Sequence, residues 1–148
     1  VTCVEKSPEA MAYLVQNARA ALAPQTVHAV QGDLFSWWRT LAAGSLDVIL
    51  CNPPYLDAAE MAALQPETAR EPAEALAGGA DGLDFYRALA ENYQRPLAPG
   101  GILALEIGWR QQGAVTALLK NAGWADIACR ADLAGRPRCL LAHAPETK

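Results

Sequence analysis

The amino-acid sequence predicts an α/β protein with a mostly parallel sheet and an antiparallel strand pair near its end. Three observations support this fold class. Short apolar runs with the length of buried strands alternate with segments whose apolar residues recur every three or four positions, as in amphipathic helices. The apolar run 48–51 stops at two consecutive prolines, through which neither a strand ladder nor a helix can continue. The last two strand-like runs are separated only by a short turn, which favours an antiparallel hairpin.

The first half of the sequence is expected to hold three strands and two helices. Ser7 supplies a helix cap, and Pro8 fits the first helical position. The helix that follows should end at Pro24, and its apolar residues at helical spacing are Met11, Leu14, Val15, Ala18 and Leu22. The expected strands are residues 1–5, 27–31 and 48–51, and a short helical piece covers 36–41.

The second half begins with a glycine-rich loop and continues with regular elements. Three glycines within residues 78–82 indicate unusual backbone angles. This loop is acidic and contains no lysine, which argues against a phosphate loop. Gly123 is expected to stop the last helix. The expected elements are a helix over 83–96, a tight turn over 97–101, a strand over 102–107, a helix over 111–122, and a hairpin of strands 125–130 and 138–143.

The composition indicates a globular domain and argues against membrane-spanning, disulfide-bonded and metal-binding proteins. The 148 residues suffice for one domain with a proper core, and 52% hydrophobic with 19% charged residues indicates a globular chain. No apolar run is long enough to span a membrane. The four cysteines show no paired spacing and the two histidines do not cluster, so we expect no disulfide, no metal and a cytoplasmic setting. A net charge of −4 makes nucleic acid an unlikely partner.

The segment Asn52-Pro53-Pro54-Tyr55 is the main candidate catalytic site. It lies at the carboxyl end of an expected parallel strand, where open α/β sheets bind their ligands. The Asn52 side-chain carbonyl and a proline carbonyl could accept both hydrogens of a planar –NH2 group, while Tyr55 stacks on the conjugated system that bears it. The alternative is a turn that merely ends the strand.

Two acidic residues are candidate cofactor contacts. Glu5 follows a strand and precedes a helix, where a carboxylate can accept hydrogen bonds from two ribose hydroxyls; a solvent-exposed strand-end acid is the alternative. Asp33 follows the next strand and is placed to meet an adenine amino group, with Leu34 and Phe35 flanking the ring.

Taken together, this order of strands and motifs resembles the class I S-adenosylmethionine-dependent methyltransferases, whose fold is Rossmann-like. The resemblance covers essentially the whole chain. Within that superfamily, Asn-Pro-Pro-Tyr is typical of enzymes that methylate amide or amino nitrogens. The segment from Glu71-Pro72 through Gly78-Gly79-Ala80-Asp81-Gly82-Leu83 to Tyr86-Arg87, followed by Glu106-Ile107-Gly108, is similar to the release-factor glutamine methyltransferases.

This resemblance implies an enzyme that methylates the glutamine side-chain amide in the Gly-Gly-Gln motif of peptide-chain release factors. S-Adenosyl-L-methionine is the implied cofactor, with Glu5 at the ribose and Asp33 and Leu34 near the adenine. Asn52, Pro53 and Tyr55 would hold the substrate glutamine, with Asn52 also close to the cofactor. One departure is Arg70, where the family commonly has an aromatic residue.

A larger departure is that the chain begins at the family's second strand. The glycine-rich loop of the first strand and the N-terminal docking domain have no counterpart, so we read residues 1–148 as a partial catalytic domain. We expect this chain alone to be marginally stable, to bind S-adenosylmethionine poorly and to be inactive. Two other functions remain open: a DNA or rRNA base amino-group methyltransferase, and a non-catalytic truncated binding module.

Overall fold

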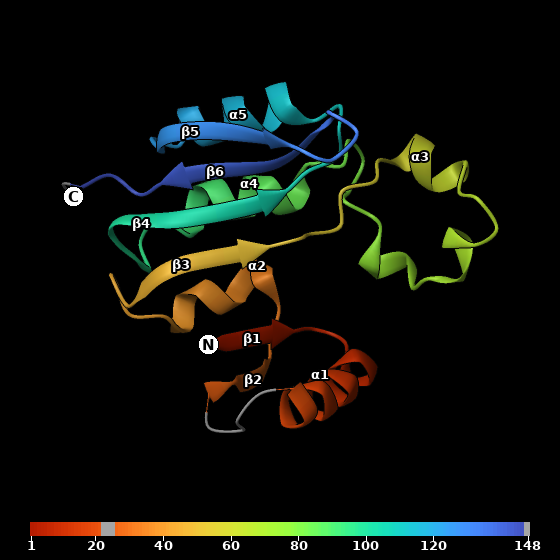
Figure 1. Cartoon of the computed structure of the whole chain (residues 1–148), viewed down its shortest axis with the longest axis horizontal. Coiled ribbons are helices and arrows are strands. Elements are labelled where there is room, and N and C mark those ends of the chain that lie inside the picture. The colour runs from red at the N-terminus through yellow and green to blue at the C-terminus, as the bar shows by residue number, and fades with distance from the viewer. Residues whose placement is uncertain (22–25, 147–148) are drawn as a thin grey trace. The chain divides into compact units, whose positions relative to one another are not determined.

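In the computed structural model, the chain folds into two units, Val1–Thr40 and Leu41–Lys148 (Figure 1). The structure describes residues 1–21 and 26–146. The first unit is a strand–helix–strand arrangement followed by a short helix. The second unit holds a four-stranded sheet with its helices.

The first unit is built on two parallel strands. Strand β1 (Thr2–Glu5) pairs with β2 (His28–Gln31), so that Glu5 lies opposite Gln31. Helix α1 (Pro8–Ala21) connects them, and the Ser7 hydroxyl caps it by accepting a hydrogen bond from the Ala10 N–H at 3.2 Å. The expected start of this helix is confirmed. Its expected end at Leu22 and Pro24 lies outside the described residues.

The short helix of this unit begins two residues earlier than the sequence suggested. Helix α2 (Leu34–Trp37) is followed by the 3₁₀ turn η2 (Trp38–Thr40). Asp33 is its N-cap, with Oδ1 accepting from the Phe35 N–H at 2.9 Å. An aspartate that caps a helix satisfies backbone donors that would otherwise lack a partner, which explains why the helix starts directly after Asp33.

The second unit contains a mixed sheet of strand order β3-β4-β6-β5. The β3 and β4 strands are parallel, whereas β6 is antiparallel to both β4 and β5. The predicted C-terminal hairpin is therefore confirmed. The strand bounds are β3 (Leu46–Cys51), β4 (Leu97–Glu106), β5 (Ala125–Ala131) and β6 (Pro137–His143).

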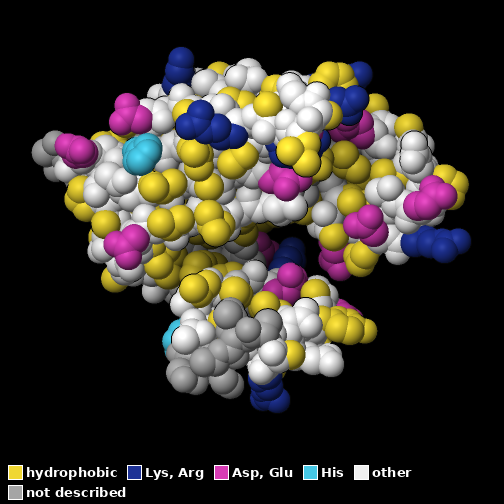
Figure 2. All heavy atoms as spheres, viewed as in Figure 1, with side chains coloured by type: hydrophobic (Ala, Val, Ile, Leu, Met, Phe, Trp, Pro, Cys, Tyr) yellow, Lys and Arg dark blue, Asp and Glu magenta, His cyan; other side chains and the backbone are white. Residues whose placement is uncertain are grey.

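Helices α4 (Asp84–Asn92) and α5 (Gln112–Asn121) pack on the far face of this sheet in Figure 1. Alternate β4 residues point toward them and are buried, as the two-residue period of a strand requires. On the near face, hydrophobic side chains gather over the strands (Figure 2). The edge strand β3 leaves Val48 and Leu50 49% and 79% exposed. The large side chains of the core are Tyr86, Leu89, Tyr93, Leu97, Leu103, Leu105, Ile107, Val115, Leu119, Trp124 and Leu140.

Two expected boundaries in this unit are wrong. The tight turn expected over 97–101 belongs to β4 as an irregular start, because Gly100 donates to the Ala144 carbonyl and Gly101 accepts from the Ala144 N–H. Helix α4 ends at Asn92 rather than at Pro96. A proline disfavours helical backbone at the residue before it, so the chain leaves the helix ahead of Pro96.

The segment between β3 and α4 is mostly irregular. Helix α3 (Ala58–Ala62) begins with a capping box, in which Asp57 and Glu60 each accept the other's backbone N–H. Two 3₁₀ turns follow, η3 (Thr68–Arg70) and η4 (Ala73–Ala75). Among the described residues, no helix is long and apolar enough to cross a membrane.

Candidate functional site

The Asn-Pro-Pro-Tyr turn leaves β3 directly after Cys51, at the carboxyl end of the parallel β3–β4 pair. Pro53 is buried and Tyr55 half-buried, whereas Asn52 is exposed. Within the described part of the chain, the Asn52 amide makes no hydrogen bond to another protein group. Asn52 also lines an open hollow of about 320 Å³ whose other residues are Leu50, Cys51, Ala104, Leu105, Glu106, Arg138 and Cys139. The turn thus offers an unused amide to a ligand.

The glycine-rich loop packs directly against this turn. Leu56 donates to the Leu76 carbonyl at 2.9 Å, and Gly78 donates to the Leu56 carbonyl at 2.9 Å. A Cβ on Gly78 would come within 2.8 Å of Tyr55 Cα, and one on Gly82 would overlap the Tyr55 carbonyl oxygen. Only glycine permits so close an approach of two backbones. The loop that the sequence singled out therefore supports Tyr55.

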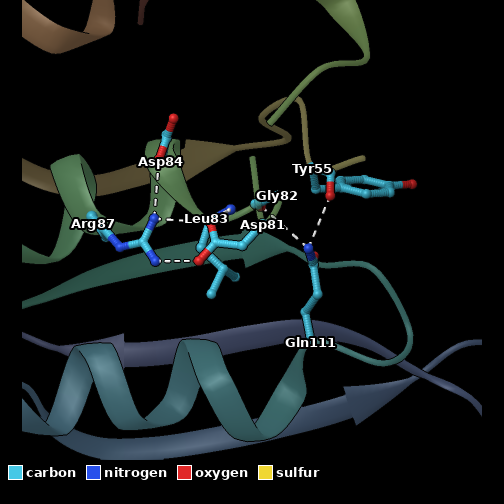
Figure 3. Close-up of polar contacts among 7 residues, drawn as sticks. All are labelled: Tyr55, Asp81, Gly82, Leu83, Asp84, Arg87 and Gln111. Carbon is cyan, nitrogen blue, oxygen red and sulfur yellow. Dashed lines mark hydrogen bonds and ion pairs between the residues drawn. The ribbon is translucent and has the colours of Figure 1, made fainter. Parts of the chain in front are cut away.

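Gln111 joins the turn, the glycine-rich loop and the start of α5 (Figure 3). Its Nε2 donates to the Tyr55 carbonyl at 2.9 Å and to the Gly82 carbonyl at 3.2 Å. Its Oε1 accepts from the Gly108 N–H at 3.0 Å. One side-chain amide thus satisfies three backbone groups in three segments, which fixes the backbone of Tyr55.

Replacing Gln111 with leucine should lower the free energy of unfolding by about 2 kcal/mol, because a side chain of similar size leaves two part-buried carbonyls and one N–H without partners. Denaturant unfolding of the complete natural polypeptide measures this effect. The neighbouring exposed residue provides the control: Gln112→Leu should change stability by less than about 0.5 kcal/mol. Equal effects of the two substitutions would refute the bridging role.

An ion-pair cluster closes the other side of the glycine-rich loop (Figure 3). Arg87 Nη1 lies 3.0 Å from Asp84 Oδ1, and the Arg87 guanidinium also pairs with both Asp81 oxygens. The hydrogen bond from Arg87 lowers the pKa of Asp81, and the same bond raises the pKa of Arg87. Both groups stay charged at neutral pH, so α4 holds the loop that supports Tyr55.

Two ionisable groups near the turn, Cys51 and Tyr86, stay neutral. Burial raises the pKa of the Cys51 thiol to about 11, so it is protonated at physiological pH and is no nucleophile. Burial also raises the pKa of Tyr86, whose hydroxyl donates to the Glu106 carbonyl at 2.8 Å. Asn52 is therefore a polar, uncharged recognition group, and the charged side chains that line its hollow, Glu106 and Arg138, lie 4.0 Å from each other. Such a site suits a substrate nitrogen that needs orientation rather than deprotonation.

Three of the four predicted cofactor residues, Glu5, Asp33 and Leu34, lie in the first unit, at the carboxyl ends of β1 and β2, whereas Asn52 lies in the second unit. Glu5 Oε1 accepts from the Ser7 N–H at 2.7 Å, and the Glu5 carbonyl accepts from Gly32 at 2.9 Å. Asp33 lies beyond β2, with Oδ2 3.0 Å from Lys6 Nζ. The Phe35 N–H and Lys6 lower the pKa of Asp33. Glu5 and Asp33 thus share one edge of the two-stranded sheet.

Leu34 and Phe35 form the first turn of α2 directly after Asp33, and Phe35 is exposed. Trp37 packs near Gly32, where a Cβ would come within 3.1 Å of its ring. The Trp37 ring therefore packs against the backbone that follows β2. The described residues contain no cluster of histidine, cysteine or acidic side chains able to hold a metal ion.

Sequence reasoning missed Gln111 as a member of the site. A recognisable signal was present, because a glutamine three residues after Gly108 can reach back to that backbone N–H in the manner of a capping box. Its two other contacts join residues 29 and 56 positions apart, which local patterns do not reveal. The Arg87 cluster was also missed, although Asp84 and Arg87 have the spacing of a helical ion pair.

Comparisons with known proteins identify relatives of this chain by sequence. A release factor glutamine methyltransferase from Rhodospirillum rubrum is 45% identical over 142 residues, covering 95% of this chain and 42% of that protein. One from Cereibacter sphaeroides is 43% identical over 140 residues, covering 94% and 49%. The chain thus spans about half the length of the curated relatives it matches. No protein-family model matches it.

A solved structure of a methyltransferase from Pyrococcus furiosus has a TM-score of 0.67 with this chain, at 19% identity, covering 98% of this chain and 62% of the other. The chain therefore has the Rossmann-like α/β fold of methyltransferases, as predicted. By sequence it is a relative of the release factor glutamine methyltransferases, so the family resemblance carried by the motifs is confirmed.

Proposed function

We propose that the complete natural polypeptide carrying this chain methylates the side-chain amide nitrogen of glutamine in the Gly-Gly-Gln motif of peptide-chain release factors. The observation that carries the proposal is the Asn52–Tyr55 turn, which presents at the carboxyl end of β3 an exposed amide without a partner among the described residues. The names of the sequence relatives supply the acceptor class. The chemistry belongs to a translation enzyme of the cytoplasm.

The residues of the first unit fit S-adenosyl-L-methionine. Glu5 has one carboxylate oxygen engaged by Ser7 and keeps a second for ribose hydroxyls. Asp33 is held ionised, and each of its oxygens retains a lone pair for the adenine amino group beside Leu34. When bound, this cofactor supplies an electrophilic methyl group on a sulfonium sulfur. We further propose that both units, residues 1–148, belong to one catalytic domain.

The remaining task of the protein is to orient a weak nucleophile. The amide nitrogen of glutamine is a poor nucleophile because its lone pair is conjugated with the carbonyl group. The Asn52 side-chain oxygen and the Pro53 carbonyl would each accept one of its N–H hydrogens, and Tyr55 would stack on the amide plane. Pro54 keeps the turn rigid. Orientation of this kind can contribute effective molarities of about 10⁵ M or more.

Methyl transfer to three acceptors tests the proposal. The complete polypeptide and labelled S-adenosylmethionine are incubated with a release factor, with ribosomal RNA and with duplex DNA. Label should enter the release factor alone. Transfer to a nucleic-acid base would establish the amino-group methyltransferase instead. Absence of transfer, together with no cofactor binding by calorimetry, would favour a non-catalytic module.

A further inference from the structure

An exposed tryptophan flanked by two arginines lies beyond the carboxyl end of β4. Trp109 is in the turn between β4 and α5, and 47% of it is exposed. The Arg110 guanidinium carbon is 4.4 Å from the centroid of the Trp109 ring, and that of Arg136, from the β5–β6 turn, is 5.9 Å away. These three residues are termed the arginine–tryptophan surface.

The sheet topology brings this surface to the same end of the sheet as the Asn-Pro-Pro-Tyr turn, where β3 and β4 terminate. Because β3 and β4 are parallel, with Cys51 opposite Leu105, Asn52 and the turn after β4 leave the sheet at the same edge. Because β6 is antiparallel to β4, the turn before it reaches that edge as well. Gly108, next to Trp109, lies beside Tyr55, because an added Cβ would be in ordinary van der Waals contact with the Tyr55 ring at 3.4 Å.

Hydrogen bonds of the β5–β6 turn hold the backbone of Arg136 in place. Asp132 Oδ1 accepts from the Ala134 N–H at 2.9 Å and from the Arg136 N–H at 3.0 Å. The Arg136 N–H is the largest cause of the lowered pKa of Asp132. The same turn presents Leu133 fully exposed. A rigid turn that displays one apolar and one cationic side chain resembles a protein-binding surface more than a solvated loop.

The charges of the surface are available to a partner. Within the described residues, neither Arg110 nor Arg136 pairs with a carboxylate. Arg138, by contrast, forms ion pairs with Asp132 (Nη2 to Oδ2, 3.4 Å) and with Glu106 (Nη1 to Oε1, 4.0 Å). Stacking on an aromatic ring uses the face of a guanidinium and leaves its N–H edge free for a carboxylate. Arginine and tryptophan are also the residues enriched among those that dominate binding energy at interfaces.

We propose that the arginine–tryptophan surface docks an acidic segment of the protein substrate beside the methylated glutamine; this rests on the function proposed above. Two arginines with an exposed leucine do not form the extended basic stripe that a nucleic-acid backbone requires, and the chain is acidic overall. The surface therefore sets affinity for the whole substrate protein, whereas Asn52–Tyr55 orients the reacting amide.

The test is the double substitution Arg110→Glu/Arg136→Glu in the complete natural polypeptide. The dissociation constant for a release factor, measured by calorimetry, should rise at least tenfold, and so should the KM for that factor. Both increases should be smaller at high salt, which screens the charges. kcat on a short Gly-Gly-Gln peptide should not change, because the peptide lacks the acidic segment. Arg39→Glu is the matched control, since Arg39 stacks on Trp38 at 4.9 Å in the first unit.

Unchanged affinity of the double variant for the release factor would overturn the docking proposal. An equal loss of methyl transfer to the release factor and to the short peptide would also overturn it, because the substitutions would then act on the reacting site. Loss of RNA binding with unaltered factor binding would assign the surface to nucleic acid instead. If the wild-type polypeptide methylates no release factor, the proposed function fails, and the calorimetric comparison still decides whether the surface binds that protein.

Discussion

Asn52→Ala should reduce methyl transfer to a release factor by about 10²- to 10³-fold in kcat, comparable to the loss of one preorganised polar group from other active sites. The reason is geometric. Asn52 supplies a neutral acceptor at the end of β3, and its neighbour Cys51 is no base, since burial raises the pKa of its thiol to about 11. Loss of the acceptor removes orientation that no neighbouring side chain replaces. Single-turnover kinetics on the complete polypeptide measure the chemical step directly.

The fold should survive this substitution. Asn52 is exposed and makes no hydrogen bond to any described residue. The melting temperature of the Asn52→Ala variant should therefore match that of the wild type. Asn121→Ala is the matched control, because Asn121 is an exposed asparagine at the end of α5. It should alter neither kcat nor stability. A fully active Asn52→Ala variant would rule out the proposed orientation of the amide.

Gly82→Ala should be the most destabilising single substitution in the glycine-rich loop, lowering the free energy of unfolding by about 3 kcal/mol. Gly82 has a φ of +73°, which an alanine adopts only with strain. Its added methyl group would also overlap the Tyr55 carbonyl oxygen and come within 2.8 Å of Gln111 Nε2. The displaced Tyr55 should lower methyl transfer as well. Thermal or denaturant unfolding gives the stability change.

Two other glycines separate strain from overlap. Gly100 has a φ of +71°, but nothing lies within 4 Å of its added Cβ, so Gly100→Ala should cost only about 1–2 kcal/mol. Gly113 lies in α5 without positive φ or close neighbours, and Gly113→Ala should stabilise by up to about 1 kcal/mol. If Gly82→Ala costs no more than Gly100→Ala, the close approach to Tyr55 has no energetic importance.

Local patterns sufficed for most of the fold. The Ser7-Pro8 helix start and the Gly123 helix stop depend on neighbouring residues, and each lies where the sequence predicts, as do the strand runs apart from the starts of β3 and β4. The errors fall where distant segments decide the backbone. The strand β4 extends to Leu97 because residues 100 and 101 pair with Ala144, more than forty positions away.

The candidate site was predictable to a similar degree. The prolines fix the turn that presents Asn52, so sequence alone locates that residue at a strand end. The support behind Tyr55 was not predictable, because Gln111 meets it across 56 positions. The capping role of Asp33, by contrast, was predictable from the sequence, because aspartate is a preferred N-cap residue. Its place after a strand indicated only a cofactor role. That Asp33 both caps α2 and contacts the adenine stays a prediction.

The measurement that tests the central claim most directly is the position of the transferred methyl group. The complete polypeptide is incubated with a release factor and isotopically labelled S-adenosylmethionine, and the factor is digested and fragmented by mass spectrometry. The label should lie on the side-chain nitrogen of the glutamine in the Gly-Gly-Gln motif, and the Asn52→Ala variant should leave it unlabelled. Label on another residue, or equal labelling by the variant, would contradict the assignment of the Asn52–Tyr55 turn as the amide-binding site.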